Sequence, residues 1–410
     1  MRRRNFLGTT AALGGLGLLA ACAPGSEDAG EAPAPAADEV DTDIDALGDI
    51  TLTVWDQEVR GAQNDAIEAL IDAFQSEHPN ITIDRSSQSF DDLQQQTGLA
   101  LSGNDVPDVL QVNNARGDMG AFVADGLLTD LSGYAEAYGW NDRFAPSVLS
   151  KMSYSSDGVT FGEGSLYGLA QTGEVCGIYY SASKLDALGL EAPTSWDELF
   201  SLVEAAAEGG EQPIMLGNLD QWPALHVFGP LQAHFVDAET IVTLGMGNAG
   251  ADWTSEENIA ALTQLAEWGS SGALGDSPNG LAYDDAWPMF ADGTGVLLIG
   301  GSWLGPDMEA VMGEDLRFMA PPAGADGTVA TTGGTGIPFS IPAAAENKDV
   351  YEAFDAVSTD GTLLPYLDYA TPSFADTAGA TLQEVIGGQT EPEAAAEALQ
   401  EDYGEFTEGT

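Results

Sequence analysis

Basic residues are scarce in this chain. Eleven lysines and arginines face 66 acidic residues among 410, which gives a formal net charge of −55. Such a charge repels nucleic acid, and no cluster of bases overrides it, so we predict no nucleic-acid partner. We interpret the acid excess as adaptation to a saline habitat, because salt screens the repulsion between carboxylates. A lineage bias toward acidic secreted proteins is the alternative.

Cysteine and histidine are also rare. There are two cysteines, Cys22 and Cys176, and three histidines, which do not fall into a metal-binding spacing. Cys176 stands in a strand-like apolar run, which predicts a small buried core residue. Residues 41–52 open like a calcium loop, but Ala46 stands where that loop needs glycine. We therefore predict no metal site and no cofactor.

One apolar run stands at the beginning of the chain, after three arginines. A basic start, a short apolar stretch and small residues before a cysteine are typical of an export signal. Residues 3–7 (RRNFL) resemble the twin-arginine export consensus, and Leu19-Ala-Ala-Cys22 resembles a lipobox. The resemblance implies an export signal over residues 1–21 that is removed. It also implies an extracytoplasmic protein anchored to the cell membrane by lipidated Cys22.

Beyond Cys22 the composition changes twice. Residues 22–49 are rich in Ala, Pro, Gly and acid, with few large apolar groups, which predicts a disordered linker. No later stretch approaches 18 uncharged apolar residues, so we expect no transmembrane helix there. About 360 residues are too many for one compact core, which indicates two lobes or domains.

Strand and helix patterns alternate along this remainder. Residues 51–55 and 80–83 read as strands, and residues 65–74 have the apolar spacing of a helix. Ser195 and Thr254 begin capping boxes that open two further helices. The alternation predicts an α/β fold with largely parallel sheets, in which ligands bind beyond the carboxyl ends of the strands.

Seven segments in sequence order carry a more specific resemblance. They resemble the sugar-binding, maltose-binding-protein-like branch of the extracellular solute-binding proteins that serve ABC importers. The segments are Phe74–Ile83, Leu101–Asp108, Phe122–Leu128, Leu166–Leu169, Ile178–Tyr180, Pro193–Leu199 and Phe290–Gly293 through Gly301–Trp303. One departure is Ser181, which stands where an asparagine usually follows the tyrosine pair.

The resemblance implies a two-lobed periplasmic-binding-protein-like fold, with a hinge of crossing strands and an interlobe ligand cleft. Lobe 1 would comprise residues 50–172 plus 337–370, and lobe 2 residues 175–334 plus 373–410. The implied function is to capture a carbohydrate by lobe closure and deliver it to an ABC permease in the membrane. We expect the protein to act as a monomer.

The glycine-rich run at residues 331–336 falls at one of the implied crossings. Small residues there would let the backbone approach a ligand or flex, and Gly334 is the candidate contact. An ordinary loop is the alternative interpretation.

A sugar site needs flat aromatic side chains for the C–H faces and oriented polar groups for the hydroxyl rim. We expect Trp303, after a Gly-Gly-Ser turn, and Trp222 to stack on the ligand, with Trp253 and Trp287 as further candidates. The tryptophans that fit core positions are Trp55, Trp140, Trp196 and Trp268. Several candidate tryptophans favour a di- or oligosaccharide over a monosaccharide.

Polar partners are expected near the carboxyl ends of the strands. The candidates are Asp56, Asn114, Arg116, Asp118, Glu174 and Asn218. Glu174 is the foremost of them, because the resemblance implies an acidic sugar contact at the first crossing. For Arg116, a surface ion pair is the alternative.

The sequence has two rival functional interpretations. A secreted glycosidase would need a carboxylate pair, but 66 acids produce such pairs by chance, and no nucleophile motif is complete. We therefore predict that the protein is not an enzyme. The second rival is a binding protein of the same fold for a peptide or another non-sugar solute.

Overall fold

The computed structural model describes residues 35–40, 42–44, 48–103, 106–324, 327–341 and 362–409. The predicted export signal at 1–21 and Cys22 lie outside these residues, as does most of the linker predicted over 22–49. No helix within these ranges has the length and apolarity needed to cross a membrane.

The first of two main sheets has the strand order β11-β3-β1-β2. Its strands are β1 (Ile50–Asp56), β2 (Ile81–Ser87), β3 (Val109–Gln111) and β11 (Phe339–Ser340). β1 runs parallel to both β2 and β3, and β11 is antiparallel to β3. The predicted strands at 51–55 and 80–83 are confirmed, and the second extends four residues further.

The helices that accompany the first sheet are 4 to 17 residues long. They are α1 (Gly61–Glu77), α2 (Phe90–Leu101), α3 (Ala121–Ala124), α4 (Ser132–Ala137), α5 (Trp140–Arg143) and α6 (Pro146–Leu149). Between and beside them are the turns η1 (Ala37–Glu39), η3 (Arg116–Gly120) and η4 (Ser150–Met152), and the hairpin of β4 (Ser153–Tyr154) and β5 (Ser165–Leu166).

Helix α1 begins four residues before the predicted cap Asp65. Its N-cap, Arg60, makes no side-chain capping bond. The backbone N–H of Ala62 donates instead to Asp307 Oδ1, at 3.3 Å. Of the predicted apolar stripe only Ile67 is buried, and Leu70 is 50% exposed. A carboxylate from a distant segment therefore replaces the local cap, which sequence spacing alone cannot show.

The second sheet has the order β12-β10-β6-β8-β7, with β9 paired to β6. Its strands are β6 (Gly173–Ser181), β7 (Ile214–Met215), β8 (Leu297–Gly301), β9 (Leu316–Met319), β10 (Ala330–Thr335) and β12 (Thr362–Leu364). β6 is antiparallel to β8, β9 and β10. The prediction of largely parallel sheets is thus right for the first sheet and wrong for the second. β6 carries the chain in from the first sheet and β10 carries it back, so these two strands must run in opposite directions.

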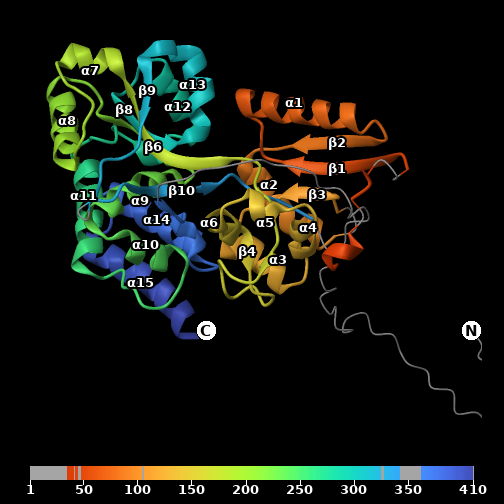
Figure 1. Cartoon of the computed structure of the whole chain (residues 1–410). Coiled ribbons are helices and arrows are strands. Elements are labelled where there is room, and N and C mark those ends of the chain that lie inside the picture. Colours follow the sequence, from red (N-terminus) through yellow and green to blue (C-terminus); the bar gives the residue numbers. More distant parts are fainter. Residues whose placement is uncertain are drawn as a thin grey trace, which may run out of the picture. The chain divides into compact units, whose positions relative to one another are not determined.

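Both faces of the second sheet are covered by helices (Figure 1). Neighbouring residues on a strand point to opposite faces, and Leu297 and Leu298 of β8 belong to two different core clusters. The helices are α7 (Ala182–Leu188), α8 (Trp196–Glu208), α9 (Pro223–Phe235), α10 (Ala238–Gly245), α11 (Glu256–Ser270), α12 (Tyr283–Ala291), α13 (Gly305–Met312), α14 (Phe374–Ile386) and α15 (Pro392–Gly409). Short turns are η5 (Pro278–Gly280), η6 (Ser302–Leu304), η7 (Gly313–Asp315) and η8 (Leu367–Tyr369).

One predicted helix cap is confirmed and one is shifted. The Ser195 hydroxyl accepts the backbone N–H of Glu198 at the start of α8, as expected. At α11 the cap is Ser255, whose hydroxyl accepts the N–H of Asn258. Thr254 is not the cap because its hydroxyl donates to Asp252 Oδ1.

The chain crosses between the sheets along β6 and β10, which lie side by side (Figure 1). Gly334 pairs with Glu174 in this ladder. The predicted second segment of lobe 1, 337–370, needs correction at its end. Thr362–Leu364 forms β12, which pairs with β10 of the second sheet, so the chain has returned to that sheet by residue 362.

Candidate functional site

A cleft of about 260 Å³ lies where β6 and β10 cross between the sheets. One wall comes from segments around the first sheet: Gln57, Arg60, Gln63, Phe90, Asp91, Gln94 and Asn113. The opposite wall comes from segments around the second sheet: Asp220, Gln221, Trp222, Leu225, His226, Trp303, Tyr366, Asp368, Tyr369, Ala375 and Asp376. The crossing strands and the residues after them add Glu174, Thr335 and Ile337.

Aromatic side chains form much of the second wall. Trp222 stands at the N-terminus of α9 and Trp303 lies in η6, directly after β8. Both contact buried Tyr283: the Trp222 and Tyr283 ring centroids are 4.4 Å apart, and Trp303 Nε1 donates to the Tyr283 hydroxyl at 2.8 Å. The His226 ring lies 5.2 Å from each tryptophan. Contacts with Tyr283 and His226 therefore fix the positions of both tryptophan side chains.

The loop before α9 positions Trp222. Gln221 has a φ of 66°, in the left-handed region that side chains other than glycine rarely adopt. Asn218 fixes the loop: its Oδ1 accepts the N–H of Ala224 at 2.9 Å, and its Nδ2 donates to Asn279 at 2.9 Å. Backbone strain of this kind is found at ligand-binding positions, and here it orients a cleft residue.

Buried carboxyl groups give the cleft its electrostatic character. Burial raises the pKa of Glu174 to about 8, with a further increase from nearby Glu58. Burial likewise raises the pKa of Asp368 to about 7. His226 shows the reverse effect, because burial lowers its pKa to about 3 and keeps the ring neutral. At neutral pH the deep part of the cleft therefore carries less charge than its residue types imply.

Among the described residues that line the cleft, Arg60 is the one with a permanently charged basic side chain. Its Nη2 lies 3.0 Å from Asp284 Oδ1, and its guanidinium stands 5.7 Å from the centroid of the Tyr283 ring. Arg60 follows β1, whereas Asp284 and Tyr283 belong to α12. The contact joins the two walls through the residue that supports Trp303.

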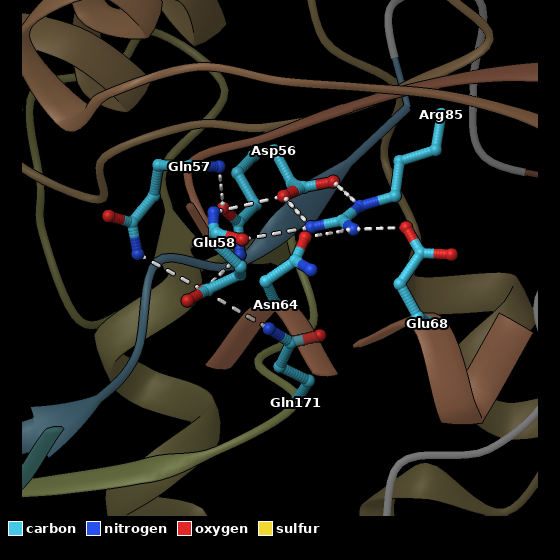
Figure 2. Close-up of polar contacts among 8 residues, drawn as sticks. Asp56, Gln57, Glu58, Asn64, Glu68, Arg85 and Gln171 are labelled. Atoms are coloured by element: carbon cyan, nitrogen blue, oxygen red, sulfur yellow. Dashed lines mark hydrogen bonds and ion pairs between the residues drawn. The ribbon is translucent and has the colours of Figure 1, made fainter. Parts of the chain in front are cut away.

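Asp56, one of the predicted ligand contacts, is fully buried and binds Arg85 instead (Figure 2). The Arg85 guanidinium donates to both Asp56 carboxylate oxygens, at 2.6 and 2.8 Å. Asp56 Oδ1 also accepts the backbone N–H of Glu58 at 2.9 Å. Arg85 also donates to the Glu58 carbonyl and to Asn64 of α1, so the pair joins the loop after β1 to that helix. Asp56 itself does not line the cleft.

Two other polar candidates are buried in the core and lie outside the cleft lining. Asn114 donates to the backbone carbonyl of Lys151 at 2.6 Å and accepts from the Tyr369 hydroxyl at 2.8 Å. Arg116 donates to the carbonyl groups of Val159 and Met246. The Arg116 guanidinium is therefore buried among backbone carbonyl groups. It lies outside the cleft lining and is not at the surface.

Asp118 lies beside the cleft. Its Oδ2 accepts from Gln94 and Asn113, each at 2.9 Å, and both of those residues line the cleft. Gly334 is buried within β10, and an added Cβ there would come within 2.8 Å of the Lys151 side chain. The close neighbour of this glycine is therefore the Lys151 side chain.

The remaining candidates do not line the cleft. Asn218 is buried within the loop that carries Trp222. Trp253 is 1% exposed and stacks with Phe228 and Phe374 in the main core of the second sheet. Trp287 is half-buried on α12, where its Nε1 donates to Asp284 at 3.1 Å. Only Trp222, Trp303 and Glu174 of the predicted site line the cleft directly.

Several cleft residues were not predicted. Arg60, Asp91, Asp220, His226 and the segment Tyr366–Tyr369 are the main ones. Asp220 stands two residues before Trp222, so its place in that loop was a usable signal. The Tyr366–Tyr369 segment combines two aromatics and an acid, but it was assigned to the wrong sheet.

Comparison with known proteins shows to which family the chain belongs. Residues 60–361 match the family model described as bacterial extracellular solute-binding protein. The chain belongs to this family. The solute-binding protein is 25% identical over 305 residues to the multiple sugar-binding protein of Streptococcus mutans; the match covers 70% of this chain and 66% of that relative.

Solved structures agree with the fold. A chitin oligosaccharide binding protein matches with a TM-score of 0.72 at 20% identity, over 88% of this chain and 99% of that one. The GacH receptor of Streptomyces glaucescens, solved without ligand and with acarbose, matches with a TM-score of 0.67 at 19% identity, over 87% and 98%. The predicted two-lobed, periplasmic-binding-protein-like α/β fold is confirmed.

Proposed function

We propose that this solute-binding protein captures a carbohydrate in the cleft by closure of its two lobes and delivers it to an ABC importer. The observation that carries the proposal is the aromatic wall. Trp222 and Trp303 offer flat apolar faces, while carboxyl, amide and guanidinium groups on the other sides offer hydrogen bonds to a hydroxyl rim. The named sugar-binding relative supports the same class of ligand.

The charges of the cleft narrow the ligand class further. Five carboxyl groups, those of Asp91, Glu174, Asp220, Asp368 and Asp376, line it with one guanidinium. An anionic sugar would meet repulsion from those groups that remain ionised, and one arginine does not compensate for it. The proposed ligand is therefore a neutral carbohydrate or one that carries an amine.

We propose the following lobes, membrane tether and oligomeric state. Lobe 1 comprises residues 50–172 and 337–341, and lobe 2 comprises residues 173–335 with the segment from 362 onward. Lipidated Cys22 tethers the protein outside the membrane, where it acts as a monomer that docks on the permease. We propose binding without catalysis, in keeping with a family of solute-binding proteins.

A thermal-shift screen tests this function. The panel contains neutral mono-, di- and oligosaccharides, amino sugars, uronic-acid sugars and short peptides. A ligand that binds only the folded state stabilises it by RT ln(1 + [L]/Kd), about 2.7 kcal/mol at a hundredfold excess over Kd. We expect stabilisation by a neutral or amino sugar and none by uronic-acid sugars. Stabilisation by peptides alone would show that the ligand is a peptide and not a sugar. Release of reducing ends from an oligosaccharide would indicate a glycosidase.

A further inference from the structure

The residues that precede the first strand contact lobe 1 at two places. They are residues 35–40 and 42–44, which we call the strap, and they fall in the segment that the sequence predicts to be a disordered linker. The first contact is with α4. An added Cβ on Gly133 would overlap the Pro35 carbonyl oxygen, so the strap backbone passes directly over this helix. Val40 packs against the core cluster to which the same helix contributes.

The second contact is with the first sheet. Ile44 is 5% exposed and forms an apolar cluster with Leu52 of β1 and Ile81 of β2. The Ile44 carbonyl also accepts the side-chain amide of Asn80, at 3.1 Å. A disordered linker does not bury large apolar side chains, because its composition gives it too few of them to offset the loss of chain entropy. The strap therefore behaves as part of the folded lobe.

Gly133 marks the position where the strap lies on α4. Glycine inside a helix is less favourable than alanine, because it loses more backbone freedom on folding. Gly133 has a helical backbone conformation without a positive φ, so its dihedral angles do not require glycine. The space above it does, because only a residue without Cβ leaves room for the Pro35 carbonyl. The glycine is thus explained by the strap and by nothing within the helix itself.

A docked strap shortens the chain that can reach a membrane from the folded protein. Twelve residues, 23–34, separate Cys22 from the strap. Fully extended, twelve residues span at most about 43 Å, whereas the 27 residues of a linker that ran from 23 to 49 would span up to about 97 Å. Both strap contacts are with lobe 1, so any pull from residue 22 acts on that lobe.

Resting on the lipidation of Cys22 in the proposed function, we propose that the strap attaches the membrane tether to lobe 1. The tether consists of residues 23–34 alone, and it holds Pro35 within about 43 Å of the lipid surface. Lobe 1 is therefore the anchored lobe, and closure over a ligand moves lobe 2 relative to it. Docking of the strap on lobe 1 does not itself depend on the lipid.

Brief digestion with a glutamate-specific protease tests the strap in the full mature chain carrying Cys22→Ala. The tether offers cuts after Glu27 and Glu31, and the strap offers one after Glu39, the last residue of η1. A protease cuts a docked segment only when that segment opens locally. We therefore expect mass spectrometry to show an early product that begins at Ala32, with the cut after Glu39 at least tenfold slower. Equal rates of cutting after Glu31 and Glu39 would overturn the strap.

Two pairs of variants give the digestion its controls. Gly133→Ala should speed the cut after Glu39 at least tenfold, although alanine by itself favours a helix. Gly98→Ala in α2 should not, because an added Cβ there has no neighbour closer than 3.8 Å. Ile44→Asn should likewise speed the cut, whereas Thr42→Asn, at an exposed strap position, should not. A cut after Glu39 that stays slow in both Gly133→Ala and Ile44→Asn would overturn the docking.

The same protease tests the tether on membranes that carry the lipidated protein. We expect it to release a chain that begins at Asp28 or Ala32 and keeps the melting temperature of the uncut protein. Release of a chain that begins at Val40, with a lowered melting temperature, as the first product would overturn the assignment of the tether to residues 23–34. Protein that is never bound to the membrane would refute the anchor in the proposed function, and the digestion of the soluble chain would still decide the strap.

Discussion

Replacing Trp303 by alanine should remove the main stacking surface for the ligand. The indole is half-buried in the wall of the cleft, and its Nε1 donates to the Tyr283 hydroxyl at 2.8 Å. The ring also packs directly on the backbone of Gly301, where an added Cβ would meet it at 2.0 Å. Its orientation is therefore fixed before the ligand arrives, and little entropy is lost when a sugar stacks on it.

The size of the effect can be set from comparable stacking. Flat ligands lose about 1–3 kcal/mol when the aromatic partner is replaced by alanine, as measured for bases. The middle of that range, about 2 kcal/mol, corresponds to a loss of about thirty-fold in affinity. Trp303→Phe should lose less, because it keeps a ring while giving up the hydrogen bond to Tyr283.

Isothermal calorimetry with the best saccharide from the thermal-shift screen would measure both variants. Trp196→Ala provides the control for a buried tryptophan outside the cleft: Trp196 is 4% exposed and its Nε1 donates to the Pro322 carbonyl at 2.9 Å. That variant should lose about 3–5 kcal/mol of folding stability and keep its affinity in the folded fraction. Unchanged affinity in a folded Trp303→Ala protein would remove Trp303 from the site and refute the stacking argument.

Three further predictions concern charge and location. Glu174→Gln should weaken binding less than Trp303→Ala at pH 7, because a carboxyl with a pKa of about 8 is mostly protonated there and resembles an amide. If the ligand contacts this protonated carboxyl, wild-type affinity should fall from pH 7 to 9 as the group ionises, and an equal fall in the variant would contradict this. Cys22→Ala should release the protein from the membrane without altering its ligand affinity, and a variant that still fractionates with membranes and incorporates labelled lipid would rule out the lipobox. The melting temperature should fall as NaCl is reduced from molar to tens of millimolar, since repulsion among the acids is then unscreened; a flat response would favour lineage bias.

Local patterns predicted the fold well where a single segment determines the outcome. The strand at 51–55 and the Ser195 cap depend on near neighbours in the sequence, and both were correct. The start of α1 was misplaced because the N–H of Ala62 in its first turn donates to Asp307, which is far away in sequence. β12 was assigned to the wrong sheet for a similar reason: its pairing with β10 is a long-range contact that its own residues do not encode.

In the site, too, residue type was predictable from the sequence and long-range packing was not. Trp222 and Trp303 were predicted from residue type and Glu174 from the family resemblance, and all three line the cleft. Trp253 looks the same in sequence, but it is packed between Phe228 of α9 and Phe374 of α14, and this burial depends on segments that are far apart in the sequence. Arg60 was overlooked because its role comes from a partner on α12, more than 200 positions away.

The chemistry of Cys176 makes lobe closure directly measurable. The thiol is fully buried, and burial raises its pKa well above the ordinary value, so the reactive thiolate is suppressed at neutral pH. With Cys22 replaced, maleimide dyes would therefore label introduced surface cysteines in preference to Cys176. A pair placed at Ala69 on α1 and Val311 on α13, both exposed, would report by energy transfer whether each lobe moves when a sugar is added. The protein's own cysteine would contribute little background to that signal.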